Sequence, residues 1–518
     1  MATTPSTSLH GEGHVPQLER GILTVKNCIA LSAAVMAPVI AVVLNAPAAG
    51  SSAGAALPVA FLLAFIAALF VGNTVIEFAK KLPSAGSFYT FCSNSLGSGA
   101  GFLTGWLYFA AFVVLTVGLF TANGVFLQIY LKSTFGWNVP WVILALILIG
   151  VAMTLSVRSI KTSVRVDLIL LGLEMFIFTL LAVITIVRAG DGNSLTYFNP
   201  ASSPTGISGT GLGLVFGLLS FIGFEAAAVL GEETGDAKRN VPLAVRGALI
   251  GVGIFFVIVL YSLAAGFHLN TASGLKAFLA DPSAFSTLAE ENAPWLKQPV
   301  ALAAVAGLFS CLLAVLNTTV RVMYAMARDR VLPSPLSRVH SRFLSPYVSI
   351  YALVTVSIVA GVILSTWVGA GLTDVYGFTG SIGTIAIILV YILANVGLIK
   401  FYWKKPDFNI WRHLIAPVCG TVVLIYPLYA TAKPGQAFPY NYVTYLVFAW
   451  MLLGIGVYAY LKRTSPEKLA ALGAAMASDE IDLAEAHSQS SVRLSRGKGL
   501  EDERDKGLED ERDQRELQ

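Results

Sequence analysis

Long apolar segments recur along this chain, and each has the length that a helix needs to cross a lipid bilayer. A hydrocarbon core of about 30 Å requires roughly 20 apolar residues in helical conformation. Twelve segments of the 518-residue chain meet this requirement, at 22–45, 57–78, 97–131, 139–156, 163–187, 209–230, 243–267, 299–327, 346–368, 372–403, 414–430 and 440–461. The pattern predicts an all-α membrane protein with twelve transmembrane helices.

The composition supports this class and disfavours catalysis. Hydrophobic residues make up 56% of the chain and charged residues 12%, whereas ordinary globular domains carry about a quarter charged residues. The four cysteines are far apart, and the six histidines fall in tails, loops or helix ends without catalytic or metal-ligand spacing. We therefore expect no enzyme, no catalytic residues, no cofactor or metal, and no nucleic-acid partner. A channel or a receptor is less favoured but stays open on composition alone.

The distribution of Lys and Arg orients the predicted helices. These residues are frequent in the N-terminal flank, in the loops after even-numbered helices and after the last helix. The loops after odd-numbered helices hold only Lys132, Arg188, Lys276, Lys297 and Lys433. Because positive residues are retained on the cytoplasmic side, both termini are expected to be cytoplasmic.

Three regions follow from these patterns: a cytoplasmic N-terminal tail at 1–20, a twelve-helix domain at 21–463, and a charged tail at 464–518. The last region ends in a tandem octapeptide, Lys-Gly-Leu-Glu-Asp-Glu-Arg-Asp, at 498–505 and 506–513. Such a segment buries too little apolar surface to offset its conformational entropy, so we expect a mostly disordered cytoplasmic tail. A surface helix at 467–487 and a regulatory role are the alternatives to simple solvated disorder.

Two predicted helices contain residues that interrupt a helix. Pro38 lies near the middle of the first and removes a backbone donor, and Gly223 interrupts the sixth beside Ser220 and Phe224. Helices one and six are corresponding members of two five-helix halves, and matching interruptions point to a transporter binding site at the membrane midplane. Freed N–H groups there can hold a carboxylate and freed carbonyls an ammonium, which suits a zwitterionic amino acid. Ordinary helix kinks are the alternative.

Several motifs occur in an order that resembles the amino acid, polyamine and organocation transporter superfamily. They are Phe-Ile-Gly-Phe-Glu at 221–225 with Gly-Glu-Glu-Thr at 231–234 and Asn-Val-Pro at 240–242, a "P-x-x-G-x-x-Y" element at 83–89, and Arg-Val-Met-Tyr-Ala-Met-Ala-Arg-Asp at 321–329 with Leu-Pro at 332–333. The resemblance covers about 18–405.

The resemblance implies a LeuT-like fold in the plasma or bacterial inner membrane. It comprises a five-plus-five inverted repeat, with repeat one at about 21–190 and repeat two at about 209–405. Helices 1 and 6 would be broken at mid-membrane, and two peripheral helices would lie at about 412–463. It also implies alternating access, with substrate held between the broken helices.

The resemblance also supplies candidate substrate-binding residues: Val35, Met36, Ala37, Pro38, Val39, Phe221, Ile222, Gly223 and Phe224. Where the family usually has Gly-x-Gly in helix one, this chain has Pro-Val-Ile at 38–40. Proline offers no N–H, so Val39 and its neighbours would have to bind the carboxylate. Backbone groups of helix six would meet the amino group, with Phe224 as an aromatic gate. Simple core packing of Phe221 and Phe224 is the alternative.

Two acidic residues are candidates for coupling. Glu174 lies deep in the fifth predicted helix, where burial favours the neutral acid, and proton-coupled relatives have a lysine at what looks like this position. It could titrate during transport, attract a cationic substrate, or be a structurally bonded acid. Glu225 competes for the coupling role, or it hydrogen-bonds loop amides to stabilise the unwound segment.

Together these features predict a secondary active transporter that moves amino acids by alternating access, with proton-coupled uptake as the first choice. The alternatives are a polyamine, ethanolamine or gamma-aminobutyrate permease, or an amino acid exchanger. The expected partners are a small amino acid or amine substrate, protons and membrane lipid.

Overall fold

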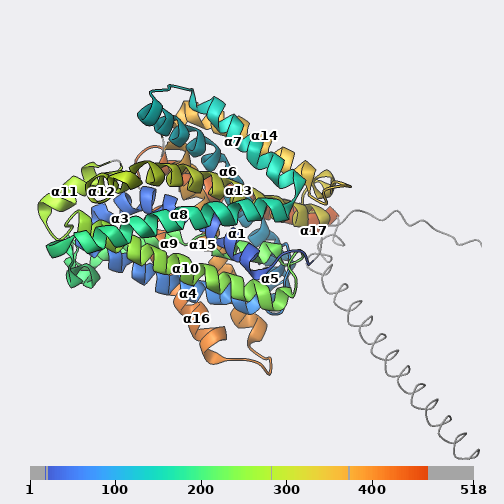
Figure 1. Ribbon diagram of the computed structural model, residues 1–518. Helices are drawn as coiled ribbons and strands as arrows, with labels where there is room; N and C mark the ends of the chain where they lie inside the picture. The colour runs from blue at the N-terminus through green and yellow to red at the C-terminus, as the bar shows by residue number, and fades with distance from the viewer. Residues whose placement is uncertain (1–17, 19–20, 282, 372–373, 434, 465–518) are drawn as a thin grey trace, which may run out of the picture.

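The described part of the chain is helical throughout (Figure 1). The structure, a computed structural model, describes residues 18, 21–281, 283–371, 374–433 and 435–464. Within these ranges the β-pairing consists of one isolated bridge between Leu23 and Thr234. The all-α prediction is therefore confirmed. The predictions for the charged tail, including 467–487 and the octapeptide repeat, lie outside the described residues.

Eleven stretches among the described residues are long and apolar enough to span a membrane. They are Val25–Ala79, Ser98–Phe135, Trp141–Arg158, Ile160–Arg188, Ile207–Leu230, Ala237–Gly266, Pro294–Arg328, Tyr347–Val368, Asp374–Tyr402, Trp411–Ala432 and Tyr440–Thr464. The first is 55 residues long and contains both segments predicted at 22–45 and 57–78. The chain is an integral multi-pass membrane protein, and the count of twelve helices stays a prediction.

The first of these stretches is divided into α1 (Val25–Met36), α2 (Pro38–Ile40), a π-helical turn (Ala41–Asn45), α3 (Ala46–Ala53), a 3₁₀ turn (Gly54–Ala56) and α4 (Leu57–Ala79). The next helices are α5 (Phe88–Leu96), α6 (Ser98–Phe135), α7 (Trp141–Arg158), α8 (Ile160–Arg188), α9 (Ile207–Ser220), the 3₁₀ helix η6 (Phe224–Leu230) and α10 (Ala237–Gly266). The last are α11 (Ala272–Ala280), α12 (Ala284–Asn292), α13 (Lys297–Arg328), α14 (Tyr347–Val368), α15 (Asp374–Tyr402), the π-helical turn η9 (Trp411–Ile415), α16 (Ala416–Ala432) and α17 (Val443–Thr464).

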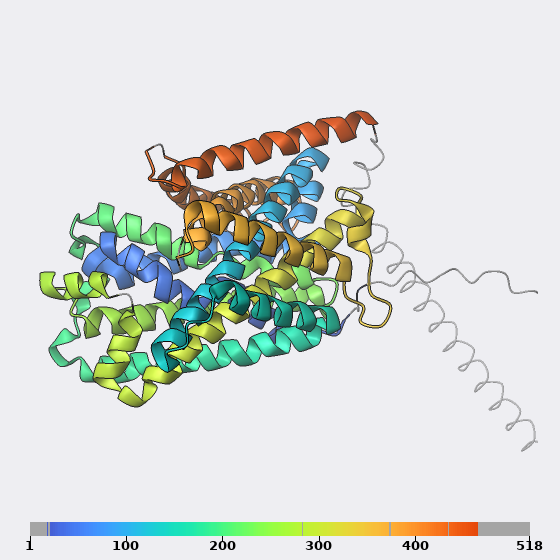
Figure 2. The same ribbon diagram turned by 90° about the horizontal axis from the view of Figure 1, so that it is seen from above.

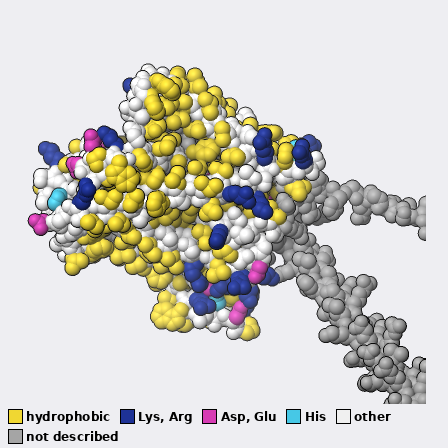
Figure 3. Space-filling view, in the orientation of Figure 1, with side chains coloured by type: hydrophobic (Ala, Val, Ile, Leu, Met, Phe, Trp, Pro, Cys, Tyr) yellow, Lys and Arg dark blue, Asp and Glu magenta, His cyan; other side chains and the backbone are white. Residues whose placement is uncertain are grey.

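The long helices lie roughly side by side, with α11 and α12 at the end opposite α5 (Figures 1 and 2). The central helices α6, α10, α13 and α15 are largely buried, whereas α16 and α17 expose most of their apolar surface. Val422 of α16 and Leu452 of α17, for example, are 61% and 65% exposed. Figure 3 shows a face that is mainly hydrophobic in its middle, with Lys and Arg toward both ends and in a cluster below. An apolar belt of this kind is compatible with surrounding hydrocarbon and not with water.

Small residues allow α9 to approach α3 and α4 closely. A Cβ built at Gly217 would lie 2.7 Å from the Cβ of Ala64, and one built at Gly213 would lie 2.7 Å from the Cβ of Ala53. Glycine and alanine at such positions let helix backbones pack tightly where no water drives association. This packing fixes the position of the helix that leads to η6.

Replacing Gly217 by leucine is expected to lower the stability of the folded protein, because the new side chain would overlap α4. Overpacking of this kind costs about 1–3 kcal/mol. The matched control is Gly211→Leu on the same helix, where a Cβ meets nothing within 4 Å. Thermal unfolding of the two purified variants in the same detergent checks the prediction. Equal melting temperatures would contradict the close packing of α9 on α4.

Candidate substrate and coupling site

The helix that begins the domain is interrupted after Met36. Ala37 adopts a left-handed conformation with φ 47°, and its N–H donates to the carbonyl of Ala34 at 3.1 Å. Pro38 then occupies the first position of α2, where a missing N–H costs least. The predicted residues Val35, Met36, Ala37, Pro38 and Val39 surround this interruption and are all buried.

A second interruption follows α9. The N–H groups of Phe221 and Ile222 donate to the carbonyls of Leu218 and Leu219, three residues back, which tightens the end of the helix. Gly223 has φ 109°, a region that favours glycine, and η6 begins at Phe224.

The two interruptions contact one another. A Cβ built at Gly223 would lie 2.3 Å from Cγ1 of Val35 and 3.0 Å from its carbonyl carbon. The structure thus brings the two predicted groups of substrate-binding residues together. The placement of the interruptions at mid-membrane and their relation by an inverted repeat stay predictions.

Ser32, which the sequence reasoning missed, joins α1 to η6. Its Oγ donates to the carbonyl of Phe224 at 2.7 Å and accepts the N–H of Ala227 at 2.8 Å. A second bond runs from Asn45 Nδ2 to Ser220 Oγ at 2.9 Å. A serine within an apolar helix, six residues before a proline, is the signal that could have identified this contact.

Glu225 is held by three donors. The N–H of Gly223 donates to its Oε2 at 3.1 Å, Tyr391 Oη donates to Oε2 at 2.7 Å, and Tyr108 Oη lies 3.5 Å from Oε1. The Tyr391 ring also lies 5.4 Å from that of Phe224. The bond to Gly223 is the contact expected of the alternative role, stabilisation of the unwound segment. The tyrosines on α6 and α15 were not foreseen.

Glu174 has a different environment. It is 1% exposed on α8, and its Oε2 has no hydrogen-bond partner among the described residues. A Cβ built at Gly307 of α13 would lie 1.9 Å from this oxygen and 3.6 Å from Val39 Cβ. The carboxyl group therefore lies beside the first interruption. The alternative of a structurally satisfied acid is less consistent with this unpartnered oxygen.

A second carboxyl group lies two turns away on α8. Asp167 is fully buried; one of its oxygens accepts Ser310 Oγ at 3.3 Å, and its Oδ2 has no partner among the described residues. The neighbouring Cys311 directs its Sγ toward the Val35 carbonyl at 3.9 Å. The contact region of α1, α8 and α13 thus contains two buried acids, which is costly unless they are neutral or paired.

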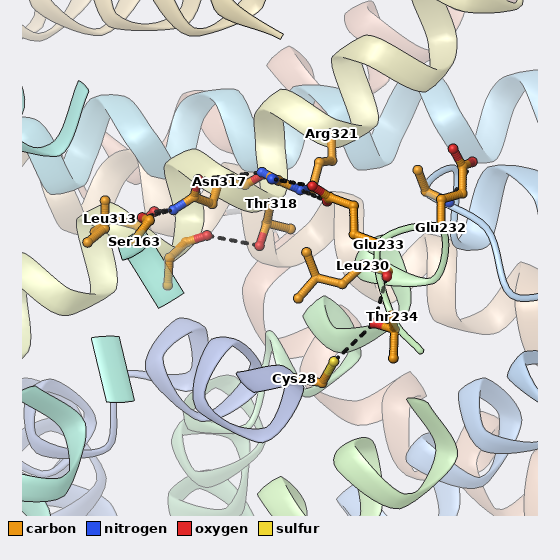
Figure 4. Close-up of polar contacts among 12 residues, drawn as sticks. Cys28, Ser163, Leu230, Glu232, Glu233, Thr234, Leu313, Asn317, Thr318 and Arg321 are labelled. Atoms are coloured by element: carbon orange, nitrogen blue, oxygen red, sulfur yellow. Dashed lines mark hydrogen bonds and ion pairs between the residues drawn. The ribbon is translucent and has the colours of Figure 1, made fainter. Parts of the chain in front are cut away.

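An ion-pair network lies beyond η6 (Figure 4), with one pair buried and the other partly exposed. Arg321 on α13 donates from Nε and Nη2 to Glu233 at 2.5 and 3.1 Å, and Arg328 donates to Glu232 at 2.9 and 3.2 Å. Thr234 contacts Cys28 Sγ at 3.2 Å. These contacts tie the segment after η6 to α13 and α1, so Glu232 and Glu233 form inter-helix contacts.

A small, almost wholly apolar pocket contacts the second interruption. It is lined by Ala68, Val71, Leu218, Leu219, Phe221, Ile222, Phe224, Ile388, Tyr391, Leu424 and Pro427. Of the predicted substrate-binding residues it includes only Phe221, Ile222 and Phe224. Residues 35–39 are packed elsewhere in the core.

Substituting Gly223 by alanine is expected to destabilise the protein by about 1–3 kcal/mol, because the backbone is strained for any L side chain and the new Cβ overlaps Val35. The double variant with Val35→Ala should recover part of the loss by removing the overlap. Thermal unfolding measures both variants, with Gly172→Ala as the control because a Cβ there meets nothing within 4 Å. An unchanged melting temperature for Gly223→Ala would contradict the contact between the interruptions.

Removing one member of the buried ion pair between Arg321 and Glu233 should lower the stability of the folded protein more than removing both. Arg321→Met leaves Glu233 buried without its partner, a change that costs about 3–5 kcal/mol. Adding Glu233→Leu should restore most of the stability, because a buried pair is often replaced by apolar residues at little cost. Lys297→Met, which breaks the exposed pair with Glu290, is the control and should cost about 1 kcal/mol or less. A double variant no more stable than Arg321→Met in thermal unfolding would refute this account.

Comparison with known proteins identifies the family of this chain. The sequence profile of the family described as "Amino acid permease" matches residues 23–465. The branched-chain amino acid permease BcaP of Bacillus subtilis (strain 168) is 26% identical over 417 residues, covering 77% of this chain and 83% of that protein. The gamma-aminobutyric acid permease of the same organism is 25% identical, with 78% and 86% covered. The low-affinity putrescine importer PlaP of Escherichia coli (strain K12) is 23% identical, with 69% and 77% covered. The chain therefore belongs to the amino acid permease family of the amino acid, polyamine and organocation superfamily, whose members are transporters and not enzymes.

Proposed function

We propose that this protein is a secondary active transporter that takes up an amino acid by alternating access, coupled to protons. One observation carries the proposal: the two helix interruptions contact one another beside Glu174, a buried acid with an unpartnered oxygen. Interrupted helices supply backbone donors and acceptors, and an adjacent buried acid supplies a group that can gain and lose a proton.

The side chains at the interruptions favour a neutral amino acid with an apolar side chain. Val35, Met36, Val39, Phe221 and Phe224 are apolar and buried, so they would surround such a side chain while backbone groups bind the amino and carboxyl groups. Glu225 is already bonded to Gly223 and two tyrosines, and it stabilises the unwound segment in this proposal. The relative that is a branched-chain amino acid permease supports the same substrate class.

A small amine is the second candidate. The free oxygen of Glu174 beside Val39 could accept an ammonium group, and one relative is a putrescine importer. A diamine needs no carboxylate-binding group, which fits the presence of Pro38 where an N–H would otherwise be available. Exchange of substrates across the membrane is compatible with either class.

Proton coupling follows from the cost of burying charge. An ionised carboxylate without a partner at this depth is unfavourable by several kcal/mol, so the closed arrangement favours protonated Glu174. Separation of α2 from α13 would admit water and favour ionisation. Closure would thus accompany proton uptake, and opening on the other side would accompany release.

The ion-pair network beyond η6 would be one of the gates. The N–H of Leu23 donates to the Glu233 carbonyl at 3.0 Å, and the N–H of Gly235 donates to the Leu23 carbonyl at 3.1 Å. The network therefore lies at the end of the molecule where the described chain begins. With both termini in the cytoplasm, as the distribution of Lys and Arg predicts, this gate would face the cytoplasm.

Replacing Glu174 by glutamine is expected to abolish the dependence of uptake on a pH gradient, because the amide cannot exchange a proton. Uptake of labelled leucine, gamma-aminobutyrate and putrescine into proteoliposomes, with and without an acidic exterior, provides the measurement. Glu290→Gln, at an exposed position of α12, is the matched control.

The outcomes separate the candidates. Leucine accumulation that rises with the gradient in the wild type and not in Glu174→Gln supports the proposal. Gradient dependence that persists in Glu174→Gln transfers the coupling role to another group. If putrescine is taken up and leucine is not, a small amine is the substrate. If uptake occurs only into vesicles preloaded with substrate, the protein is an exchanger.

A further inference from the structure

A buried histidine lies at the junction between α4 and the start of α16, away from the site described above. His413 belongs to η9 and is 3% exposed. The ring of Tyr402, at the end of α15, stacks on the imidazole with the centroids 3.7 Å apart and an interplanar angle of 12°. The Nε2 atom lies 3.5 Å from Glu77 Oε2 of α4 and has no hydrogen-bond partner among the described residues.

The other ring nitrogen defines the protonation state of this arrangement. His413 Nδ1 accepts the backbone N–H of Asn409 at 2.9 Å, so this nitrogen carries no proton and the neutral ring has its proton on Nε2. The backbone N–H of His413 donates in turn to the Asn409 carbonyl at 2.8 Å. Asn409 Oδ1 accepts the N–H groups of Trp411 and Arg412, both at 3.1 Å.

These bonds form a reciprocal helix cap. In a capping box, the side chain at the helix start accepts backbone N–H groups while a side chain of the first turn reaches back to the N–H of the cap residue. Asn409 has the first role, and His413, four residues along the chain and not the usual three, has the second. The usual glutamate or glutamine is replaced by a histidine, whose charge changes between about pH 5 and 8 when its environment is ordinary.

The cap is connected to α4 by several contacts. Asn73 Nδ2 donates to the Arg412 carbonyl at 2.6 Å, and Tyr402 Oη donates to the Glu77 carbonyl at 3.2 Å. Glu77 also pairs with Lys80 at 2.6 Å. The other charged groups around the junction are Lys81, Lys405, Asp407 and Arg412, with Lys81 paired to Asp407 and the ammonium of Lys405 over the rings of Phe401 and Tyr402.

We propose that His413 is a proton-responsive latch between α4 and α16. Neutral His413 closes the cap by accepting the Asn409 N–H. A second proton can bind only at Nδ1, which abolishes this bond, while the resulting imidazolium is attracted to Glu77 through Nε2–H. Protonation therefore opens the first turn before α16 and strengthens the link to α4.

Hydrogen exchange of the full chain in lipid nanodiscs tests the latch without a transport assay. In a peptide covering 407–413, exchange protection corrected for intrinsic rates should fall roughly tenfold from pH 8 to pH 5, the scale of one cap hydrogen bond. His413→Asn provides an acceptor in the place of Nδ1 that does not titrate, so its protection should not depend on pH. His413→Gln also provides an acceptor that does not titrate and should behave in the same way.

His340→Asn is the matched control. His340 Nδ1 also accepts backbone N–H groups, from Arg342 at 3.1 Å and Phe343 at 3.3 Å, but lies outside the junction with α4. This variant should leave the pH response of 407–413 unchanged, and Glu77→Gln should shift its midpoint to lower pH. Protection that is independent of pH in the wild type, or that depends on pH equally in His413→Asn, would overturn the proposal.

A consequence for transport rests on the proposed function and is measured separately. In the Glu174→Gln background, uptake at equal pH on both sides should change between pH 8 and pH 5.5, and His413→Asn should remove this change. Absence of any uptake would count against the proposed function. The hydrogen-exchange measurement on 407–413 would then still confirm or refute the latch. If the Glu174→Gln variant and the Glu174→Gln/His413→Asn double variant show the same pH response of uptake, the latch does not regulate transport.

Discussion

The contact between the two helix interruptions is the constraint on which the rest of the site depends. An interrupted helix releases backbone groups that hydrocarbon cannot satisfy, so irregular backbone at membrane depth requires protein partners. Ser32 supplies two of them, to the Phe224 carbonyl and the Ala227 N–H, and Glu225 supplies another to Gly223. Gly223 permits this arrangement because it leaves room for Val35. The second interruption is thus stabilised by Ser32 of α1, the helix that ends at the first interruption, and by Glu225 of its own segment.

The two acids that the sequence singled out have opposite environments. Glu225 accepts from a backbone N–H and from Tyr391, with Tyr108 close by, so it supports the geometry of the second interruption. Glu174 has an oxygen without a partner beside Gly307 and the first interruption. A carboxyl group whose oxygens are all hydrogen-bonded loses those bonds if its protonation state changes. A carboxyl group with an unpartnered oxygen can gain a proton or a water molecule without losing a bond. This difference is the physical reason for assigning coupling to Glu174.

Polar contacts also extend to the outermost helices. Asn395 on α15 accepts Thr74 Oγ1 of α4 at 2.6 Å and donates to Thr421 Oγ1 of α16 at 3.1 Å. Together with Glu77, Tyr402 and His413, these residues form a polar seam at which α4, α15 and α16 meet. Although α16 exposes most of its surface, hydrogen bonds link it to a helix that packs on α9 and α10. The seam thus joins α16 to the central helices of the domain.

The sequence by itself determined the all-α membrane class, the family, and Pro38 and Gly223 as residues that interrupt two helices, because apolar length, proline and glycine act locally along the chain. It also identified Glu174 and Glu225 as unusual, since a charge in an apolar segment is costly wherever the helix packs. Only the tertiary structure decided that Gly223 meets Val35, that Ser32 bridges α1 and η6, and that Tyr108 and Tyr391 hold Glu225. The same holds for His413, which looked like an ordinary residue at a helix end until Glu77, more than three hundred positions earlier, proved to be its neighbour. Such contacts join distant parts of the chain, and their geometry depends on how all the helices pack together.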